Sequence, residues 1–194
     1  MTPAGIAAIF SIGLVFVVLI YVGLTTYNAV VALRQRIDKA WSNIGVVLRQ
    51  RHDQLPNLVS AVRDLMAYER DVLVRVTEAR AAYTPSASIH DQAATSEATT
   101  AAVRSLFAVV ERYPEIKSAA NVLDLQDEIE RLEGMIADRR ELYNDQVYRY
   151  NTRISQVPGL LVAPLFGWQP REFFMADPAD LLRPDADLRD GETE

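Results

Sequence analysis

The first 33 residues of this 194-residue chain carry no charged side chain, and this stretch limits the possible folds more than any other feature. Within it, residues 4–24 (AGIAAIFSIGLVFVVLIYVGL) are apolar except for Ser11 and Tyr21. A helix needs about 20 such residues to cross roughly 30 Å of bilayer hydrocarbon. The run has no basic residue before it and is too long for the core of a cleaved signal peptide. The sequence therefore predicts a retained transmembrane anchor over residues 1–25.

Basic residues follow this anchor but do not precede it. Arg34, Arg36 and Lys39 lie within about 15 residues of its end, and the cytoplasmic flanks of membrane spans are enriched in such residues. We therefore expect a single-pass protein with its N-terminus outside and its body in the cytoplasm. The same three side chains are candidates for contact with anionic membrane lipid. An ordinary solvated helix face would have the same composition.

The composition excludes several classes of site. The chain has no cysteine, which excludes disulfides, thiolate zinc sites, Fe–S clusters and cysteine nucleophiles. Its net charge of −6 and its pI near 5.0 provide no basic field for nucleic acid. The glycine loops that cradle phosphates and the G-x-S-x-G nucleophile pattern are both absent from the sequence. We therefore expect no nucleic-acid partner, no cofactor and no enzymatic activity.

Beyond the anchor, apolar residues recur at steps of three and four, which is the period of an amphipathic helix. Pro56, Pro114 and Pro158 are expected to begin or end helices, because proline lacks the backbone N–H that a helix interior needs. No stretch alternates with the period of a strand. The predicted class is all-α: the transmembrane helix is followed by an antiparallel up-and-down four-helix bundle over residues 26–157. Its helices are expected over about 26–54, 57–83, 95–113 and 120–156.

Two segments follow the predicted bundle. Residues 176–194 hold seven acidic and two basic residues and are predicted to form a disordered tail. Residues 158–175 are apolar and aromatic but are interrupted by proline and glycine. The sequence leaves three interpretations of this segment open. It could pack on the bundle, dock at the membrane interface or fill a groove on a neighbouring subunit. Its large aromatic side chains are the candidate interaction residues: Phe166, Trp168, Phe173 and Phe174.

The dipeptide His52-Asp53 is the most suggestive pair for chemistry. A metal site would need further ligands, and the only other histidine in the sequence is His90. Adjacent helical side chains also point about 100° apart, so the pair does not share one ligand direction. We therefore predict a structural corner between the first two helices, formed by His52, Asp53, Pro56 and Asn57, with Asp53 as the cap. A hydrolase that uses His52 and Asp53 is the alternative.

Four asparagines lie within or beside the predicted helices, although asparagine is a mediocre helix former. If they are buried, their hydrogen bonds fix the register between helices; if they are exposed, they are simply solvated. The residues are Asn43, Asn57, Asn144 and Asn151.

Two long motifs, YNAVVALRQRIDKAWSNIGVVLRQRHDQLPNLV at 27–59 and YNDQVYRYNTRISQVPGLLVAPLFGWQPREFF at 143–174, resemble the signatures of the LemA family. Two shorter segments, TEARAAY at 77–83 and ERYPEIK at 111–117, fall in the matching places between them. The resemblance implies a bacterial inner-membrane protein with one N-terminal span, an outward N-terminus and a cytoplasmic antiparallel four-helix bundle. It implies no established molecular function.

Together these features predict a non-enzymatic, membrane-anchored scaffold with coiled-coil-like helices. The expected partners are membrane lipid and further copies of the chain, and the expected role is to organise or remodel the membrane. The alternative is a membrane-tethered adaptor in signalling or envelope quality control, which would recruit an unidentified protein partner.

Overall fold

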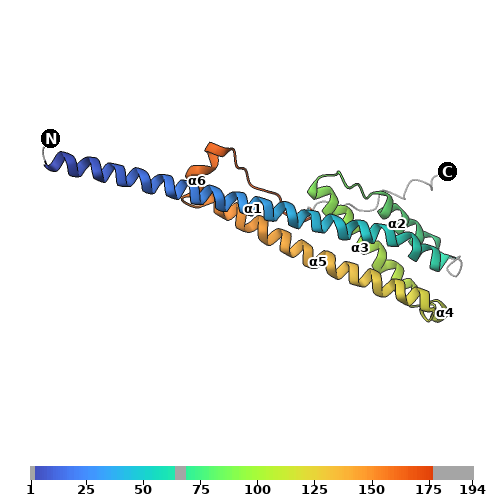
Figure 1. Ribbon diagram of the computed structural model, residues 1–194. Helices are drawn as coiled ribbons and strands as arrows, with labels where there is room; N and C mark the ends of the chain where they lie inside the picture. Colours follow the sequence, from blue (N-terminus) through green and yellow to red (C-terminus); the bar gives the residue numbers. More distant parts are fainter. Residues whose placement is uncertain (1–2, 64–68, 177–194) are drawn as a thin grey trace, which may run out of the picture. The chain divides into compact units, whose positions relative to one another are not determined.

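The computed structural model describes residues 3–63 and 69–176, and these residues form helices and connections without a strand (Figure 1). The predicted all-α class is confirmed for this part of the chain. Most of the predicted acidic tail, residues 177–194, lies outside the described residues. The elements are α1 (Pro3–Arg63), α2 (Arg70–Ala81), α3 (Ile89–Val110), α4 (Pro114–Lys117), α5 (Ala120–Ser155), α6 (Gly159–Val162) and the 3-10 helix η1 (Ala163–Phe166).

The chain divides into two compact units. Unit 1 comprises Met1–Trp41 and Leu142–Arg171, and so contains the first part of α1, the end of α5, α6 and η1. Unit 2 comprises Ser42–Glu141 and Glu172–Glu194, and so contains the rest of α1, the first part of α5, and α2 to α4. Helices α1 and α5 each contribute to both units.

One described helix, α1, is long and apolar enough to cross a membrane by length and composition. Its most apolar window has a mean hydropathy of 2.7, and none of that window is buried against the rest of the chain. The large apolar side chains exposed between Ile9 and Leu24 range from 46% exposed at Ile20 to 75% exposed at Phe10. A helix that is apolar on all faces belongs either in a protein core or in a membrane.

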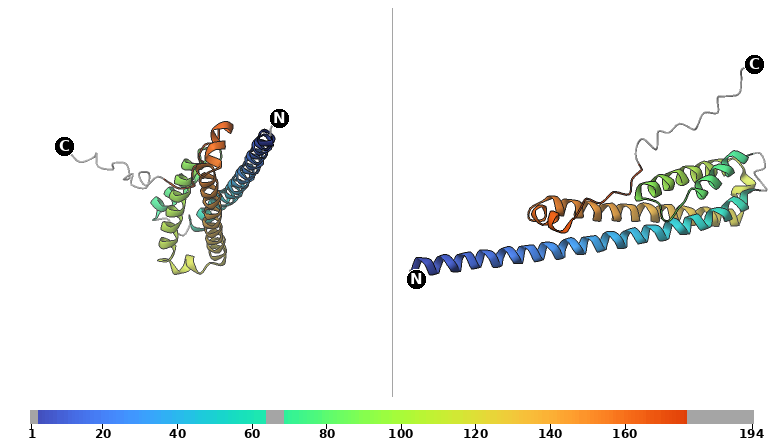
Figure 2. Two further views of the ribbon diagram at one scale, coloured as in Figure 1. Left: turned by 90° about the vertical axis from the view of Figure 1, so that its left-hand side faces the viewer. Right: turned by 90° about the horizontal axis from the view of Figure 1, so that it is seen from above.

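The core of unit 1 forms where the amphipathic part of α1 packs against the end of α5, and Figure 2 shows these two segments side by side. The ring of Trp41 on α1 lies 5.6 Å from the ring of Tyr143 on α5. The buried side chains on both helices are spaced three, four or seven residues apart, as expected for one face of a helix. They are Val30 and Ile37 on α1, and Tyr143, Val147, Tyr150 and Ile154 on α5.

In unit 2, side chains from five helices share one hydrophobic core. Burial of a leucine or valine side chain contributes about 1.5–3 kcal/mol, so this core is the main source of stability for the unit. Helix α1 contributes Leu55, Leu58, Val59 and Val62, and α2 contributes Leu73 and Val76. The remaining members are Ala102, Val103, Leu106, Val109 and Val110 of α3, Ile116 of α4, and Val122 and Ile129 of α5.

The helix corner predicted at Pro56 is wrong, because α1 continues through this proline to its end at Arg63. Proline has no N–H, so the carbonyl of His52 loses its usual helical donor. The guanidinium of Arg80 on α2 takes that place, since its Nε donates to the His52 carbonyl at 3.4 Å. Burial of Leu55 and its neighbours in the core of unit 2 keeps the chain helical on both sides of the proline.

Two other predicted boundaries differ from the structure. Helix α2 begins at Arg70, so the residues directly after Pro56 belong to α1 rather than to a second helix. Helix α3 begins at Ile89, before the predicted start near residue 95, because the Ser88 side chain caps it by accepting a hydrogen bond from the Asp91 backbone N–H at 3.0 Å. Capping by serine satisfies one of the N–H groups that a helix start leaves unpaired.

We predict that the energetic contributions of Pro56 and Arg80 are coupled. Pro56→Ala should raise the free energy of unfolding, because proline in a helix interior costs about 3 kcal/mol relative to alanine and the new N–H can bond the His52 carbonyl. Arg80→Met should lower it by about 1 kcal/mol in the original chain, where it leaves that carbonyl without its donor. The loss should be smaller in the Pro56→Ala background.

Thermal unfolding of the detergent-purified full-length chain, followed by circular dichroism, measures all four variants of this cycle. Arg75→Met is the matched control, because Arg75 is an exposed residue on the same helix. Equal effects of Arg80→Met in the two backgrounds would show that Arg80 does not compensate for the proline.

Candidate functional site

After α5 the chain doubles back and places α6 and η1 beside α1 (Figures 1 and 2). We call residues 157–171 the hook. Gly159 permits the turn, because a Cβ at this position would collide with the backbone carbonyl of Arg153 on the last turn of α5. Gly167 ends η1 with a φ of 62°, a left-handed conformation that favours glycine.

Side-chain hydrogen bonds from α5 hold the hook in place. The Tyr150 hydroxyl donates to the carbonyl of Gln169 at 3.0 Å, and burial raises the pKa of Tyr150, so the hydroxyl remains a donor at neutral pH. Asn151 binds the backbone of Arg171 twice: its Nδ2 donates to the carbonyl at 2.9 Å, and its Oδ1 accepts from the N–H at 2.8 Å. Of the four asparagines, Asn151 therefore positions the hook rather than another helix.

The four aromatic candidates separate between the two units. In unit 1, the rings of Phe166 and Trp168 stack at 5.2 Å, and Tyr27 of α1 lies 4.8 Å from the first and 5.7 Å from the second. Trp168 is 8% exposed, whereas Phe166 is 52% exposed. In unit 2, Phe174 is 2% exposed and Phe173 is 39% exposed. Trp168 and Phe174 are thus packing residues, and Phe166 and Phe173 are the aromatic side chains that present a surface.

The apolar surface of the hook is larger than its aromatic residues alone. No charged side chain occurs between residues 157 and 168. The basic residues Arg34, Arg36 and Lys39 are exposed on α1, within the same unit. Unit 1 therefore combines the apolar run of α1, the apolar part of the hook and a short basic stretch. The exposed large apolar side chains of the hook are Val157, Leu160, Leu161, Leu165 and Phe166.

The predicted corner residues lie inside α1. The Nδ1 atom of His52 is 3.1 Å from Oδ1 of Asp53, and the His52 ring lies 5.3 Å from the ring of Tyr83. The side chain of Asn57 donates to Oε1 of Gln54 at 3.0 Å. The capping role predicted for Asp53 is wrong, because no helix begins there. Across residues 3–63 and 69–176, no group of three or more His, Asp or Glu side chains is placed to hold a metal ion.

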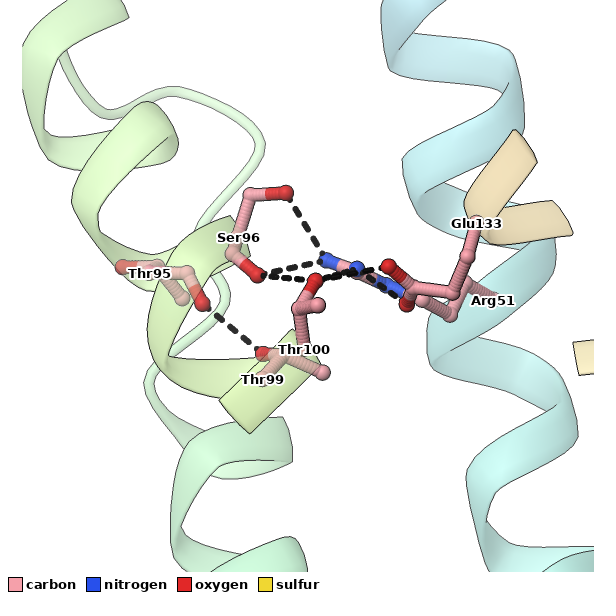
Figure 3. Close-up of polar contacts among 6 residues, drawn as sticks. All are labelled: Arg51, Thr95, Ser96, Thr99, Thr100 and Glu133. Atoms are coloured by element: carbon pink, nitrogen blue, oxygen red, sulfur yellow. Dashed lines mark hydrogen bonds and ion pairs between the residues drawn. The ribbon is translucent and has the colours of Figure 1, made fainter. Parts of the chain in front are cut away.

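A buried polar network in unit 2 centres on Arg51, which is 3% exposed (Figure 3). Its Nη1 donates to Oε1 of Glu133 on α5 at 2.7 Å and to the hydroxyl of Thr100 on α3 at 3.0 Å. Its Nη2 donates to the hydroxyl of Ser96 on α3 at 3.0 Å. The Thr100 hydroxyl lies 2.7 Å from the other carboxylate oxygen of Glu133 and closes the network. One guanidinium therefore joins three helices.

Sequence reasoning missed this network, although a signal for it exists. Arg51 occupies a position on the apolar stripe of α1, between Leu48 and Leu55 at steps of three and four. A charged residue on a core-facing stripe indicates a buried partner, because a buried arginine remains ionised and needs acceptors. Glu133 also borders a groove between α3 and α5, which Phe174 lines as well. The contacts of Arg51 are those of a structural residue that fixes helix positions.

Glu133 is predicted to contribute more to stability than the partner in an exposed ion pair. Glu133→Gln leaves the guanidinium of Arg51 buried without its counter-charge, and should lower the free energy of unfolding by about 3 kcal/mol. Glu97→Gln is the matched control, because its pair with Arg140 is partly exposed and such pairs contribute about 0–1 kcal/mol.

The double variant Arg51→Met/Glu133→Leu should recover most of the loss, because apolar side chains of similar volume replace both charges. Denaturant unfolding of the full-length chain in detergent measures each value. If Glu133→Gln and Glu97→Gln lost the same amount, the buried network would contribute no more than a surface pair.

The sequence is also similar to known proteins. The model of the LemA family matches residues 40–186, which extend from α1 through α5 and the hook. The magnetosome proteins MamQ 1 and MamQ 2 of Paramagnetospirillum magneticum are each 36% identical over 78 residues, and MamQ of Magnetospirillum gryphiswaldense is 32% identical over 78 residues. These matches cover 40% of this chain and 29% of each relative. Because the family match extends over more than half of this chain, the chain belongs to the LemA family.

Proposed function

We propose that this protein is a non-enzymatic scaffold that crosses a bacterial inner membrane once and self-associates there. The observation that carries the proposal is the helix α1. Its stretch from Ile9 to Leu24 is apolar on all faces and exposed, which supports a location in hydrocarbon. The same helix continues into the hydrophobic core of unit 2 without a break. Membership of the LemA family supports a membrane-associated role.

The body of the scaffold is proposed to be an antiparallel up-and-down four-helix bundle. Support comes from the shared core in unit 2, to which α1, α2, α3 and α5 all contribute. The Arg51 network supports the same arrangement, because it fixes α1 against both α3 and α5. A bundle whose central polar groups bond one another is suited to holding a shape. This favours a scaffold over a catalyst.

Self-association is proposed because unit 2 retains exposed apolar side chains on three helices, namely Val46 on α1, Val74 on α2 and Leu123 on α5. A membrane anchor confines all copies to one surface and raises their effective concentration, so weak contacts between such residues are sufficient for assembly. Assemblies of anchored copies would organise or deform the membrane beneath them.

We predict that the full-length chain, purified in mild detergent, has a defined mass above that of its 21.7-kDa monomer. Light scattering coupled to gel filtration measures the protein mass without the detergent, over a range of concentrations. The variant Val74→Ser/Leu123→Ser should lower the mass, because it removes exposed apolar side chains without touching the buried core. Ser60→Ala, an exposed change on α1, is the control.

A monomer at every concentration would rule out self-association as the function. The recruiting adaptor would then be the better account of the molecule.

We also predict that the N-terminus lies outside and the body lies in the cytoplasm, because Arg34, Arg36 and Lys39 follow the span. The chain has no cysteine, so single cysteine variants report on one position each. Ala4→Cys should react with a membrane-impermeant maleimide in intact spheroplasts, and Ser60→Cys should react only after lysis. The reverse pattern would place the body outside the cytoplasm.

A further inference from the structure

The hook displays a cluster of large apolar side chains that no described part of unit 1 covers. Leu165 is 79% exposed, Val157 is 72% exposed and Leu161 is 68% exposed, with Leu160 and Phe166 each 52% exposed. Monomeric soluble proteins rarely leave a contiguous apolar patch of this kind in water, and such patches mark interaction sites.

The packing and hydrogen bonds of the rest of the hook keep these side chains exposed. Ala163 and Trp168 anchor the inner side of the hook, at 7% and 8% exposed, and Tyr150 and Asn151 bind its return path. The close approach at Gly159 fixes where the turn begins. With its inner side packed, the hook holds its leucines outward.

The position of the hook along α1 identifies what covers it. Its rings Phe166 and Trp168 contact Tyr27, which comes three residues after Leu24, the last residue of the apolar run. At a rise of 1.5 Å per residue, that is about 4.5 Å along the helix. The polar layer on each side of the hydrocarbon is roughly 5–8 Å thick. If α1 spans a bilayer through this run, the hook meets the membrane–water interface.

Charge supports the same assignment. Arg34 and Arg36 are exposed on α1, about 15–18 Å beyond Leu24 along the helix axis. Helical side chains tilt toward the N-terminus of the helix, so these guanidinium groups reach back toward the headgroups. At physiological ionic strength the attraction to anionic lipid extends about 8 Å from the surface.

We propose that the apolar edge of the hook is a lipid-docking site, which inserts into the headgroup–acyl boundary of the leaflet on the body side of the membrane. This inference rests on the proposed membrane anchor. Leucine and phenylalanine side chains enter this boundary to a depth of about 5–10 Å when an amphipathic segment lies in the plane of the interface. Trp168 and Tyr27 lie at the level where aromatic residues of membrane proteins gather.

The test uses the full-length chain in nanodiscs with one or several copies per disc, and lipids brominated at shallow or deep positions of the acyl chain. Single cysteines carry an environment-sensitive fluorophore: Leu165→Cys on the hook, Phe16→Cys in the span, and Tyr148→Cys as an exposed control on α5. Tyr148 belongs to unit 1 and is 62% exposed. The label at Leu165→Cys should lose most of its fluorescence to shallow bromines, whatever the copy number. The label at Phe16→Cys should be quenched by deep bromines, and that at Tyr148→Cys by neither.

A second variant tests whether the apolar side chains of the hook insert into lipid or the hook only lies near the bilayer. Leu161→Asp puts a charge on the hook at an exposed position, so it should release the Leu165→Cys label from quenching and leave the Phe16→Cys label quenched. Leu142→Asp, at a 50% exposed position on α5, is the matched control and should change neither.

Each remaining outcome overturns a specific claim. If the Phe16→Cys label is quenched and the Leu165→Cys label is not, the hook does not dock on lipid and the anchor stands. If neither is quenched, the anchor fails and the hook proposal fails with it. If the Leu165→Cys label changes only in discs that hold several copies, the hook contacts another copy of the chain instead of the bilayer.

Discussion

The structure depends on α1 remaining helical through Pro56. Four side chains next to or beyond the proline lie in the core of unit 2. They face this core together only because the helix continues without a break. These residues are Leu55, Leu58, Val59 and Val62. Each contributes about 1.5–3 kcal/mol when buried, whereas the proline costs about 3 kcal/mol. Arg80 reduces that cost by donating to the carbonyl that the proline leaves without a helical partner. Burial therefore outweighs the local helix-breaking preference of proline, and one helix carries both the exposed apolar run and part of the core of unit 2.

Compared with an apolar replacement of both partners, the Arg51 network adds specificity rather than stability, although removal of Glu133 alone leaves a buried charge unpaired. Apolar helix faces tolerate sliding by a turn, because one leucine can replace another in the contact. A guanidinium that must meet Glu133 on α5 and Ser96 and Thr100 on α3 at hydrogen-bonding distance tolerates no such shift. A buried ion pair is seldom more stable than an apolar replacement, but it penalises every register in which the charge loses its partner.

The sequence alone predicted much of the helical structure and little of the polar detail. Helix α5 follows from its spacing, since Val122, Ile129, Leu132 and Tyr143 all lie on the predicted stripe and are buried. The corner at Pro56 was wrong because tertiary burial and a side chain far along the chain compensate for a local effect. The sequence offers all four aromatic side chains of residues 158–175 as interaction candidates and does not separate them, whereas in the structure Trp168 is buried and Phe166 is exposed. The hydrogen bonds of Tyr150 and Asn151 to the backbone of the hook determine which aromatic side chain points inward. The spacing of apolar residues in the sequence does not reveal these bonds.

The two apolar surfaces of unit 1 share one physical explanation. A loop that only ended a domain would turn its leucines inward, toward α1, where the rings of Phe166 and Trp168 already lie against Tyr27. Instead Gly159 and Gly167 set a path on which Leu161 and Leu165 stay exposed. The same segment contacts Tyr27, three residues after the apolar run of α1 ends. Exposed leucines are unfavourable in water and favourable in hydrocarbon, and the same holds for the bare face of α1 beside them. The lipid docking proposed for the hook and the membrane span proposed for α1 would thus place both apolar surfaces in the same surroundings.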